Sequence, residues 1–397
     1  MNRAAVAILA ISCAACVATP ASIGPSGSVP TSTASPSSPS PSAPVTTPSP
    51  TEDPKGYSEV ASFGSEDTVT APRDVVETPF GLVAVGTRYL TAVLPLFGSV
   101  AREGQVWRSS DGLAWENETP ADVFRGAELE HVFVAGDGSI VVTGYYDDPD
   151  SEEDLPRGRI WRSTDGASWR QTDDLGTSSF LRVSHGPKGH VAVVVDMVAG
   201  GSELWHSPDG LEWHTTRADN SRWRDVGAGP QGFVAVGSNA SGTAGRIVAS
   251  SDGQTWIVAE DPPDLGHVIP RDANWLGMDA LFSDTVRFSE NGLTWRRFGT
   301  HPLDTVDPCR EYISSLFAIE ELLVSATVLS FPCSEGGLVA NGHVRQSTDT
   351  LTWTELVPPG QAGSGQHTVT MGLSTGAHVV LIGQVGTRAT FWADEVR

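Results

Sequence analysis

A seven-residue motif, Ser-x-Asp-Gly-x-x-Trp, recurs along the chain and constrains its fold more than any other feature. Four copies are complete, a fifth has Asn in place of Asp, and a sixth has Thr in place of Gly. The residues that define the six copies are Ser109, Asp111 and Trp115; Ser163, Asp165 and Trp169; Ser207, Asp209 and Trp213; Ser250, Asp252 and Trp256; Ser289, Asn291 and Trp295; and Ser347, Asp349 and Trp353. A repeat of this kind indicates an architecture built from one repeated unit.

Each copy is predicted to form the turn of a β-hairpin. The residue three positions before each Ser is apolar, so a strand leads into the motif. Asp-Gly between apolar strands is a strong hairpin signal because Gly takes a positive φ without strain. Burying one Trp removes about 150–250 Å² from water, which at about 25 cal/mol per Å² gives roughly 4–6 kcal/mol as an upper estimate. We therefore interpret the Ser, Asp and Trp residues as structural.

A second signature, a Val-rich strand buried on both faces, precedes each hairpin and occurs seven times, most clearly at 81–86 and 232–237. The motif's third residue falls at 111, 165, 209, 252, 291 and 349, so successive copies are 54, 44, 43, 39 and 58 residues apart. Four-stranded propeller blades repeat at roughly 40–50 residues. The prediction is an all-β, seven-bladed propeller of four-stranded antiparallel blades, with six or eight blades as alternatives. A strand near 57–63 has no blade of its own and is predicted to close the ring in the last blade.

The motif resembles the Asp-box, or BNR, repeat of sialidases and sortilin-type β-propellers. The family pattern is Ser-x-Asp-x-Gly-x-Thr-Trp, and each copy here is one residue shorter. The resemblance covers most of the chain after the N-terminal tail. It implies the propeller scaffold, in which the box lies away from the catalytic face, and it implies no particular chemistry.

The N-terminus is predicted to be a secretory signal of the lipoprotein type over residues 1–16. One Arg is followed by a short apolar run and small residues, and the run is too short to span a bilayer. Cys16 is the favoured acylation site and Cys13 the alternative. An ordinary secreted protein with an incidental Cys is the competing interpretation.

Residues 17–56 are almost entirely Ser, Thr, Pro, Ala and Gly, so we expect a disordered tether. The propeller is expected over 57–397. The chain has only two Lys among 25 basic residues, and this bias with abundant Ala, Gly and Pro indicates a GC-rich, actinobacterial-like genome. We expect the protein to be extracytoplasmic, monomeric and held on the outer face of the cell membrane only by its lipid.

Cys309 and Cys333 are predicted to form a disulfide. They are symmetric about position 321, where a hairpin turn is expected, so the two side chains would face each other across the ladder. An extracytoplasmic location favours the oxidised pair.

Two loops of the first two blades are candidate binding elements. The acidic stretch 147–154 offers Asp148, Asp150 and Glu152 as weak Ca²⁺ ligands, although a solvated acidic loop is the preferred interpretation. The apolar insertion 88–98, with Tyr89 and Phe97, is expected to lie beside Tyr145 and Tyr146. These four aromatic residues could form a binding rim, or the insertion could fold back as additional core.

Charge and motifs exclude several functions. With 48 acidic and 25 basic residues and a net charge of −23, the chain is a poor partner for nucleic acid. It has no serine-hydrolase elbow, phosphate loop or dinucleotide fingerprint, and its His residues form no ligand cluster in sequence. No cofactor is expected beyond the Ca²⁺ candidate.

The sialidase comparison provides the sharpest enzyme hypothesis. Those enzymes use a trio of Arg, a Tyr–Glu nucleophile pair and an early Phe/Tyr-Arg-Ile-Pro motif, and none of the five Tyr here lies in a recognisable catalytic context. The favoured interpretation is therefore a non-enzymatic module that binds or assembles an envelope protein or glycan. The alternative is a glycan-cleaving hydrolase, because carboxylate separations cannot be read from sequence.

Overall fold

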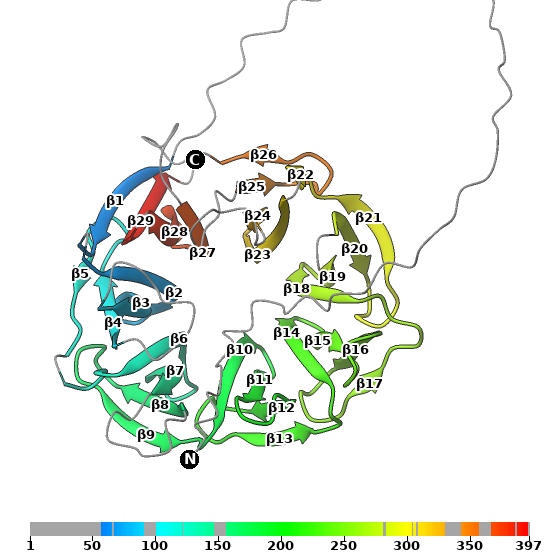
Figure 1. Ribbon diagram of the computed structural model, residues 1–397, viewed down its shortest axis with the longest axis horizontal. Helices are drawn as coiled ribbons and strands as arrows, with labels where there is room; N and C mark the ends of the chain where they lie inside the picture. The colour runs from blue at the N-terminus through cyan, green and yellow to red at the C-terminus, as the bar shows by residue number, and fades with distance from the viewer. Residues whose placement is uncertain are drawn as a thin grey trace, which may run out of the picture. The chain divides into compact units, whose positions relative to one another are not determined.

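The fold was analysed in a computed structural model, which describes residues 57–65, 67–90, 101–120, 122–146, 156–280, 283–303, 305–306, 309–329, 343–356, 367–385 and 387–395. The signal segment and the tether lie outside these residues. The described strands form seven antiparallel sheets arranged as the blades of one ring (Figure 1). The predicted seven-bladed propeller is confirmed.

The first four blades each contain four strands in sequential order. Their bounds are β2 (Val69–Thr78), β3 (Gly81–Tyr89), β4 (Arg102–Ser109) and β5 (Glu116–Asn117) in blade 1; β6 (Ala127–Val134), β7 (Ile140–Tyr146), β8 (Arg157–Ser163) and β9 (Arg170–Asp174) in blade 2; β10 (Ser178–Gly186), β11 (Gly189–Asp196), β12 (Ser202–Ser207) and β13 (His214–Arg217) in blade 3; and β14 (Arg222–Gly229), β15 (Gly232–Ser238), β16 (Gly245–Ser250) and β17 (Ile257–Val258) in blade 4.

Blade 5 follows the same plan, whereas blades 6 and 7 vary it. Their bounds are β18 (Leu265–Arg271), β19 (Asn274–Asp279), β20 (Thr285–Ser289) and β21 (Arg296–Thr300) in blade 5; β22 (Thr305–Val306), β23 (Cys309–Ile319), β24 (Leu322–Leu329), β25 (Val344–Ser347) and β26 (Thr354–Glu355) in blade 6; and β27 (His367–Ser374), β28 (His378–Val385), β29 (Arg388–Glu395) and β1 (Ser58–Phe63) in blade 7. Blade 6 thus has a fifth strand, β22, where four were predicted.

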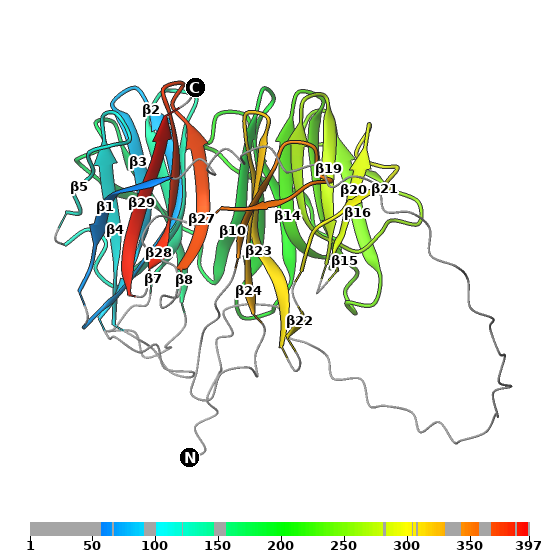
Figure 2. The same ribbon diagram turned by 90° about the horizontal axis from the view of Figure 1, so that it is seen from above.

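The ring is closed by the predicted N-terminal strand. β1 pairs antiparallel with β29, with Ser62 opposite Thr390. Figure 2 shows β1 lying across the outer edge of the last blade. The amide of Thr70 in β2 donates to the carbonyl of Thr387 at 2.7 Å, which ties the first blade to the last. Both free edges are thereby paired or covered, as a closed all-β architecture requires.

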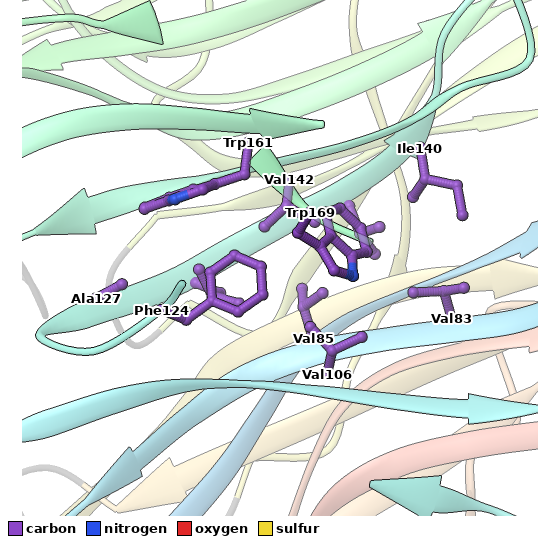
Figure 3. Close-up of a cluster of buried hydrophobic side chains, with 11 residues drawn as sticks. Val83, Val85, Val106, Phe124, Ala127, Ile140, Val142, Trp161 and Trp169 are labelled. Atoms are coloured by element: carbon purple, nitrogen blue, oxygen red, sulfur yellow. The ribbon is translucent and has the colours of Figure 1, made fainter. Parts of the chain in front are cut away.

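The hydrophobic core lies between neighbouring blades. Figure 3 shows the seam of blades 1 and 2, where Val83, Val85 and Val106 of blade 1 face Phe124 and Trp161 of blade 2. Each of these side chains is at most 1% exposed. Side chains on both faces of a middle strand such as β3 are buried, because each face packs on a different blade. This is the physical reason for the continuous Val-rich runs.

The six Ser-Asp loops share one hydrogen-bonding pattern. In the first, the amide of Gly112 donates to Ser109 Oγ at 2.8 Å, and the amides of Leu113 and Ala114 donate to Asp111 Oδ1 at 2.8 and 3.0 Å. The indole of Trp115 donates to the carbonyl of Gly112 at 3.0 Å. The loop is wider than a two-residue hairpin turn, because it runs from Ser109 to Trp115 before β5 begins. The same Ser and Asp or Asn acceptors recur in the other five loops.

Every innermost strand carries one β-bulge at a corresponding position. The register shifts occur in β2, β6, β10, β14, β18, β23 and β27, the strands nearest the centre of the ring in Figure 1. A bulge inserts one residue and turns the following side chain toward a new direction. In blade 6 the bulge also changes the register of β23 and β24, so that Glu311 faces Leu329.

The bulges join the blades into a ring of polar contacts, one at each seam. In order around the ring, these are Asp74 Oδ2 with the Val132 amide at 3.0 Å, His131 Nε2 with the Leu181 carbonyl at 3.0 Å, Arg182 Nε with Asp225 Oδ1 at 3.8 Å, Asp225 Oδ2 with the Val268 amide at 3.0 Å, His267 Nε2 with the Ile313 carbonyl at 3.3 Å, Ser315 Oγ with the Val369 carbonyl at 2.9 Å, and Thr370 Oγ1 with the Pro72 carbonyl at 3.0 Å. We call this set the bulge ring. It satisfies backbone groups that the bulges free, and it links all seven blades.

Candidate functional site

The candidate site is a cluster of charged and phenolic side chains at the seam of blades 1 and 2. Arg73 lies at the bulge of β2, Tyr89 is the last residue of β3, and Arg102 is the first residue of β4. From blade 2, Glu128 on β6 pairs with Tyr145 on β7. We call these five residues the Glu128 cluster. It lies at the opposite end of β4 from the Ser-Asp loop, which begins at Ser109.

Glu128 is the acceptor at the centre of this cluster. Its Oε1 accepts hydrogen bonds from the Tyr89 hydroxyl at 2.6 Å and from Arg73 Nη2 at 3.2 Å, and its Oε2 accepts from Arg102 Nη1 at 2.6 Å. The Tyr145 hydroxyl also helps to hold the pKa of Glu128 low. The guanidinium of Arg102 also lies 5.0 Å from the centre of the Tyr145 ring. The Glu128 side chain is only 6% exposed.

These contacts fix the ionisation states of the cluster. Burial would raise the pKa of Glu128, but Arg73, Arg102 and the hydrogen bonds from Tyr145 and Tyr89 outweigh it and lower this pKa to about 2. Burial, with the charge of Glu128 next in importance, raises the pKa of both Tyr89 and Tyr145 above the usual range. At neutral pH the cluster therefore holds one carboxylate, two guanidinium groups and two neutral phenols.

This arrangement limits the chemistry that the cluster can perform. A carboxylate with a pKa of about 2 is ionised at neutral pH and has no proton to donate, and it is a weak base. A Tyr nucleophile needs an environment that favours its phenolate, whereas Tyr89 and Tyr145 both have raised pKa values. The cluster is thus suited to holding two blades together or to presenting Arg73, which is 36% exposed, to a ligand.

The neighbouring Glu130 has a raised pKa, whereas that of Glu128 is lowered. It is the bulge residue of β6, its Oε1 lies 3.9 Å from Arg73 Nε, and its side chain is 24% exposed. Burial raises its pKa, Arg73 opposes this effect, and the charge of Glu128 adds to it. Two carboxyl groups whose environments move their pKa values apart are a pattern found in acid–base pairs of hydrolases.

The described residues of the predicted binding rim, Tyr89, Tyr145 and Tyr146, do not form an exposed aromatic patch. Tyr89 is buried with its hydroxyl on Glu128, and Tyr145 is half-buried in the same cluster. Tyr146 is half-buried, and the Arg159 guanidinium lies 3.9 Å from the centre of its ring. Phe97 lies outside the described residues.

The other predicted sites fall mainly outside the described part of the chain. This applies to Cys13, Cys16, Cys333 and the acidic loop with Asp148, Asp150 and Glu152. Cys309 is the first residue of β23, and the turn between β23 and β24 falls at 320–321. Within the described ranges, no three His, Cys, Asp or Glu side chains come together in a way that could hold a metal ion. The same ranges contain no helix long and apolar enough to cross a membrane.

Sequence reasoning missed Arg73, Arg102, Glu128 and Glu130. The cluster residues come from five strands, and the first and last, Arg73 and Tyr145, are 72 positions apart, so no local motif marks them. One signal for the site is present in the sequence. Glu128 and Glu130 place two charged residues just before the apolar run 132–135. A buried charge in such a strand requires a partner.

Comparison with known proteins supports the fold and goes no further. No family model and no curated protein matches the chain. Among solved structures, YCF48 from Cyanidioschyzon merolae has a TM-score of 0.50 and 14% identity, with 86% of this chain and 98% of that chain covered. A Dos1 propeller has a TM-score of 0.46 and 10% identity, with 85% of this chain and 95% of that chain covered. A mutant Trypanosoma rangeli sialidase has a TM-score of 0.42 and 13% identity, with 86% of this chain and 57% of that chain covered. At these identities the likeness is one of fold alone.

Proposed function

We propose that this seven-bladed propeller is a non-enzymatic binding or assembly module of the cell envelope. In this proposal, a lipid on Cys16, or on Cys13, holds the protein to the outer face of the cell membrane, and the tether 17–56 separates the ring from the bilayer. Its ligand is an envelope glycan or protein. The N-terminal sequence and its Ser/Thr/Pro-rich continuation support the location.

The non-enzymatic part of the proposal rests on the hydrogen bonds that the Glu128 carboxylate accepts. Three side chains donate hydrogen bonds to its carboxylate, and two of the donors are Arg residues. A catalytic carboxylate must exchange a proton or attack a substrate, and either step would have to disrupt this network. A carboxylate that fixes two guanidinium groups is better suited to a rigid recognition surface.

A thermal-shift screen of the full chain against purified envelope glycans tests the proposal. Ligand at about 100 times its dissociation constant adds roughly 2.7 kcal/mol to the free energy of unfolding, which for a ring of this size is a rise of several degrees in Tm. We expect such a rise with at least one glycan class. A rise caused by Ca²⁺ alone, abolished by chelator, would instead support Asp148, Asp150 and Glu152 as ligands.

A glycan-cleaving hydrolase is the second candidate, and the Glu128–Glu130 pair is the observation that favours it. The two groups lie on one strand, and Glu130 has a raised pKa, as a general acid requires. Fluorogenic glycosides test this candidate directly. Release of product by the native chain, lost in Glu130→Gln with an unchanged Tm, would establish hydrolysis and overturn the non-enzymatic proposal.

A further inference from the structure

Each Ser-Asp loop closes the seam between its own blade and the preceding one. A Cβ atom added at Gly112 would lie 2.7 Å from Val380 of blade 7, and one at Gly292 would lie 2.3 Å from Val234 of blade 4. A Cβ at Gly210 would lie 2.9 Å from Phe133 of blade 2, and one at Gly253 would lie 2.3 Å from His206 of blade 3. At these seams the loop can approach closely because the turn residue has no side chain.

The sixth loop departs from this rule, and a pocket lies beside it. Thr350 occupies the position of the glycine, with a φ of 64°, and its side chain is fully buried in the seam of blades 5 and 6. A pocket of about 240 Å³ opens there, lined by Leu276 and Phe288 of blade 5 and by Asp349 of the loop. In the seam of blades 4 and 5, the registers place Val234 and Ala249 where Leu276 and Phe288 lie here.

One wall of this pocket is aromatic. The rings of Phe288 and Phe298 are 5.4 Å apart with an interplanar angle of 32°, and the guanidinium of Arg296 lies 4.7 and 5.4 Å from their centres. Both rings are half-buried. Packed phenyl rings of this kind present an apolar surface with a negative π face, to which C–H groups are attracted.

The rim of the pocket is polar and carries charges of both signs. Arg271 lines the pocket and donates a hydrogen bond to the carbonyl of Thr348, and Asp272 and Asp349 are exposed beside it. Arg271 offsets one of the two Asp carboxylates, so the residues that line the pocket carry a net charge of −1. A rim with one net negative charge disfavours an anionic ligand, and its guanidinium and carboxylate groups can pair with neutral hydroxyl groups.

We propose that the seam of blades 5 and 6 binds one neutral pyranose residue of a glycan. A pyranose has an apolar C–H face for the phenyl wall and vicinal hydroxyl groups for the polar rim. The pocket is smaller than the roughly 300–1,000 Å³ of sites for drug-sized ligands, so it fits a single ring and not an extended oligosaccharide. This inference rests on the proposed function, since it takes a glycan as the module's ligand, and it places the site at the opposite end of the blades from the Glu128 cluster.

Saturation-transfer NMR on the full chain with a panel of neutral methyl pyranosides tests the proposal. We expect at least one methyl glycoside to receive saturation, strongest at the protons of one ring face. Phe298→Ala should weaken binding about tenfold or more by removing half of the aromatic wall. Asp272→Gly should weaken it similarly without backbone strain, because residue 272 has a φ of 53° that Gly adopts freely.

Matched variants distinguish a loss of binding at the pocket from a general effect on folding. Asp261 is another exposed Asp with a positive φ, 48°, and Asp261→Gly should leave glycoside binding unchanged. Asp272→Asn keeps the hydrogen-bonding groups, so a neutral ligand should lose no more than about threefold in affinity, whereas a cationic ligand should lose far more.

Three outcomes would overturn the inference. Saturation that is equal in native, Phe298→Ala and Asp272→Gly proteins would place the sugar elsewhere, and an accompanying Tm rise with envelope glycans would leave the proposed function intact. Saturation of acetyl-arginine amide but of no glycoside would assign the pocket to a basic segment of a protein partner. If neither probe receives saturation, the pocket is not a binding site.

Discussion

At the residue scale, the turn glycine of the Ser-Asp loops is a conformational requirement. Gly166 has a φ of 75°, and a Cβ there would be 3.3 Å from its nearest neighbours, so the space would nearly admit a side chain. The cost of substitution at this position therefore comes mainly from the backbone. Thr350 shows that the fold accepts one strained residue in such a turn.

Gly166→Thr should lower the free energy of unfolding by about 1–2 kcal/mol, because a β-branched residue is strained at positive φ. Gly166→Asn is the matched control and should cost at least about 0.5 kcal/mol less, since Asn visits this region readily. Urea denaturation measures both. Equal losses for Thr and Asn would mean that crowding, and not φ, limits this position.

Glu128 is the second residue whose role can be isolated. Glu128→Gln should destabilise the protein by about 3–5 kcal/mol, since it removes the charge of a carboxylate, 6% exposed, that pairs with both Arg73 and Arg102. Glu103→Gln removes the partner of Arg88 in a pair whose side chains are 40% and 31% exposed, and it should cost less than about 1 kcal/mol. Guanidinium denaturation compares the two. A Glu128→Gln protein as stable as Glu103→Gln would show that the cluster does not hold the seam.

Two buried His residues give the stability a defined pH dependence. Burial, then His185, lowers the pKa of His190 to about 4 from 6.5, and burial, then Arg345, lowers that of His301 to about 3. Between these values and 6.5 the unfolded chain binds more protons than the folded chain, so stability falls as the pH falls from 6.5 toward 4. Each His can remove up to about 3 kcal/mol in this way.

Unfolding by urea at pH 7 and pH 5 measures this loss, and His190→Phe provides the control. Phe suits the site, because the His190 ring already packs against Phe133 at 5.0 Å and against His185 at 4.5 Å. The variant should lose less stability between pH 7 and pH 5 than the native chain. An identical loss in both proteins would contradict the assignment to His190.

At the scale of the strand, the inner-strand bulge is the element that joins one blade to the next. Asp225 follows the bulge of β14, and its carboxylate accepts the Val226 amide at 2.9 Å and the Val268 amide of blade 5 at 3.0 Å. Asp74 does the same with the amides of Val75 and Val132. One carboxylate thus caps its own bulge and binds the neighbouring blade.

Asp225→Ala should leave two buried amides without acceptors and cost about 2–3 kcal/mol. Hydrogen exchange at the Val268 amide should accelerate, while the amide of Val132, whose acceptor is Asp74, should keep its protection. Exchange measured by NMR on the native chain and the variant checks this. Unchanged protection of Val268 would mean that the bulge ring does not couple the blades.

The strands could be predicted from the sequence, whereas the bulges and the Glu128 cluster could not. Apolar runs such as 81–86 and the Asp-Gly turns are local patterns, and local patterns fix the strands, their order and the closing strand. A bulge changes the register by one residue and leaves no fixed sequence mark, so the contact between Arg73 and Glu130 could not be anticipated. The sequence predicts Tyr89 in an exposed rim, whereas the structure buries it, because its hydrogen bond to Glu128 joins residues 39 positions apart.

At the scale of the whole molecule, closure of the ring depends on β1. Tyr57 is 4% exposed in the seam of blades 6 and 7, and Phe63 packs against Trp107 of blade 1 at 6.2 Å and Phe391 of blade 7 at 5.7 Å. The strand therefore contributes to the cores on both sides of blade 7. Because β1 precedes the first blade in the sequence and pairs within the last blade, it ties the two ends of the propeller together.

A chain shortened to begin at Ser65 should melt at least about 10 °C below the native chain, because several kcal/mol of apolar burial are lost and the edge of β29 is exposed. Circular dichroism during heating measures the change, and a chain shortened only to begin at Gly56 is the control, expected to melt like the native protein. Equal melting temperatures for the two shortened chains would contradict closure by β1.

In the proposed function, the propeller binds its glycan ligand without cleaving it. The most direct test is to incubate the full chain at stoichiometric concentration with an envelope glycan pool and to determine by mass spectrometry the masses of bound and free glycans. We predict bound glycans with the same masses as in the starting pool and no new fragments in solution. Shortened glycans that disappear with Glu130→Gln would contradict the claim, because they would make the seam of blades 1 and 2 an active site.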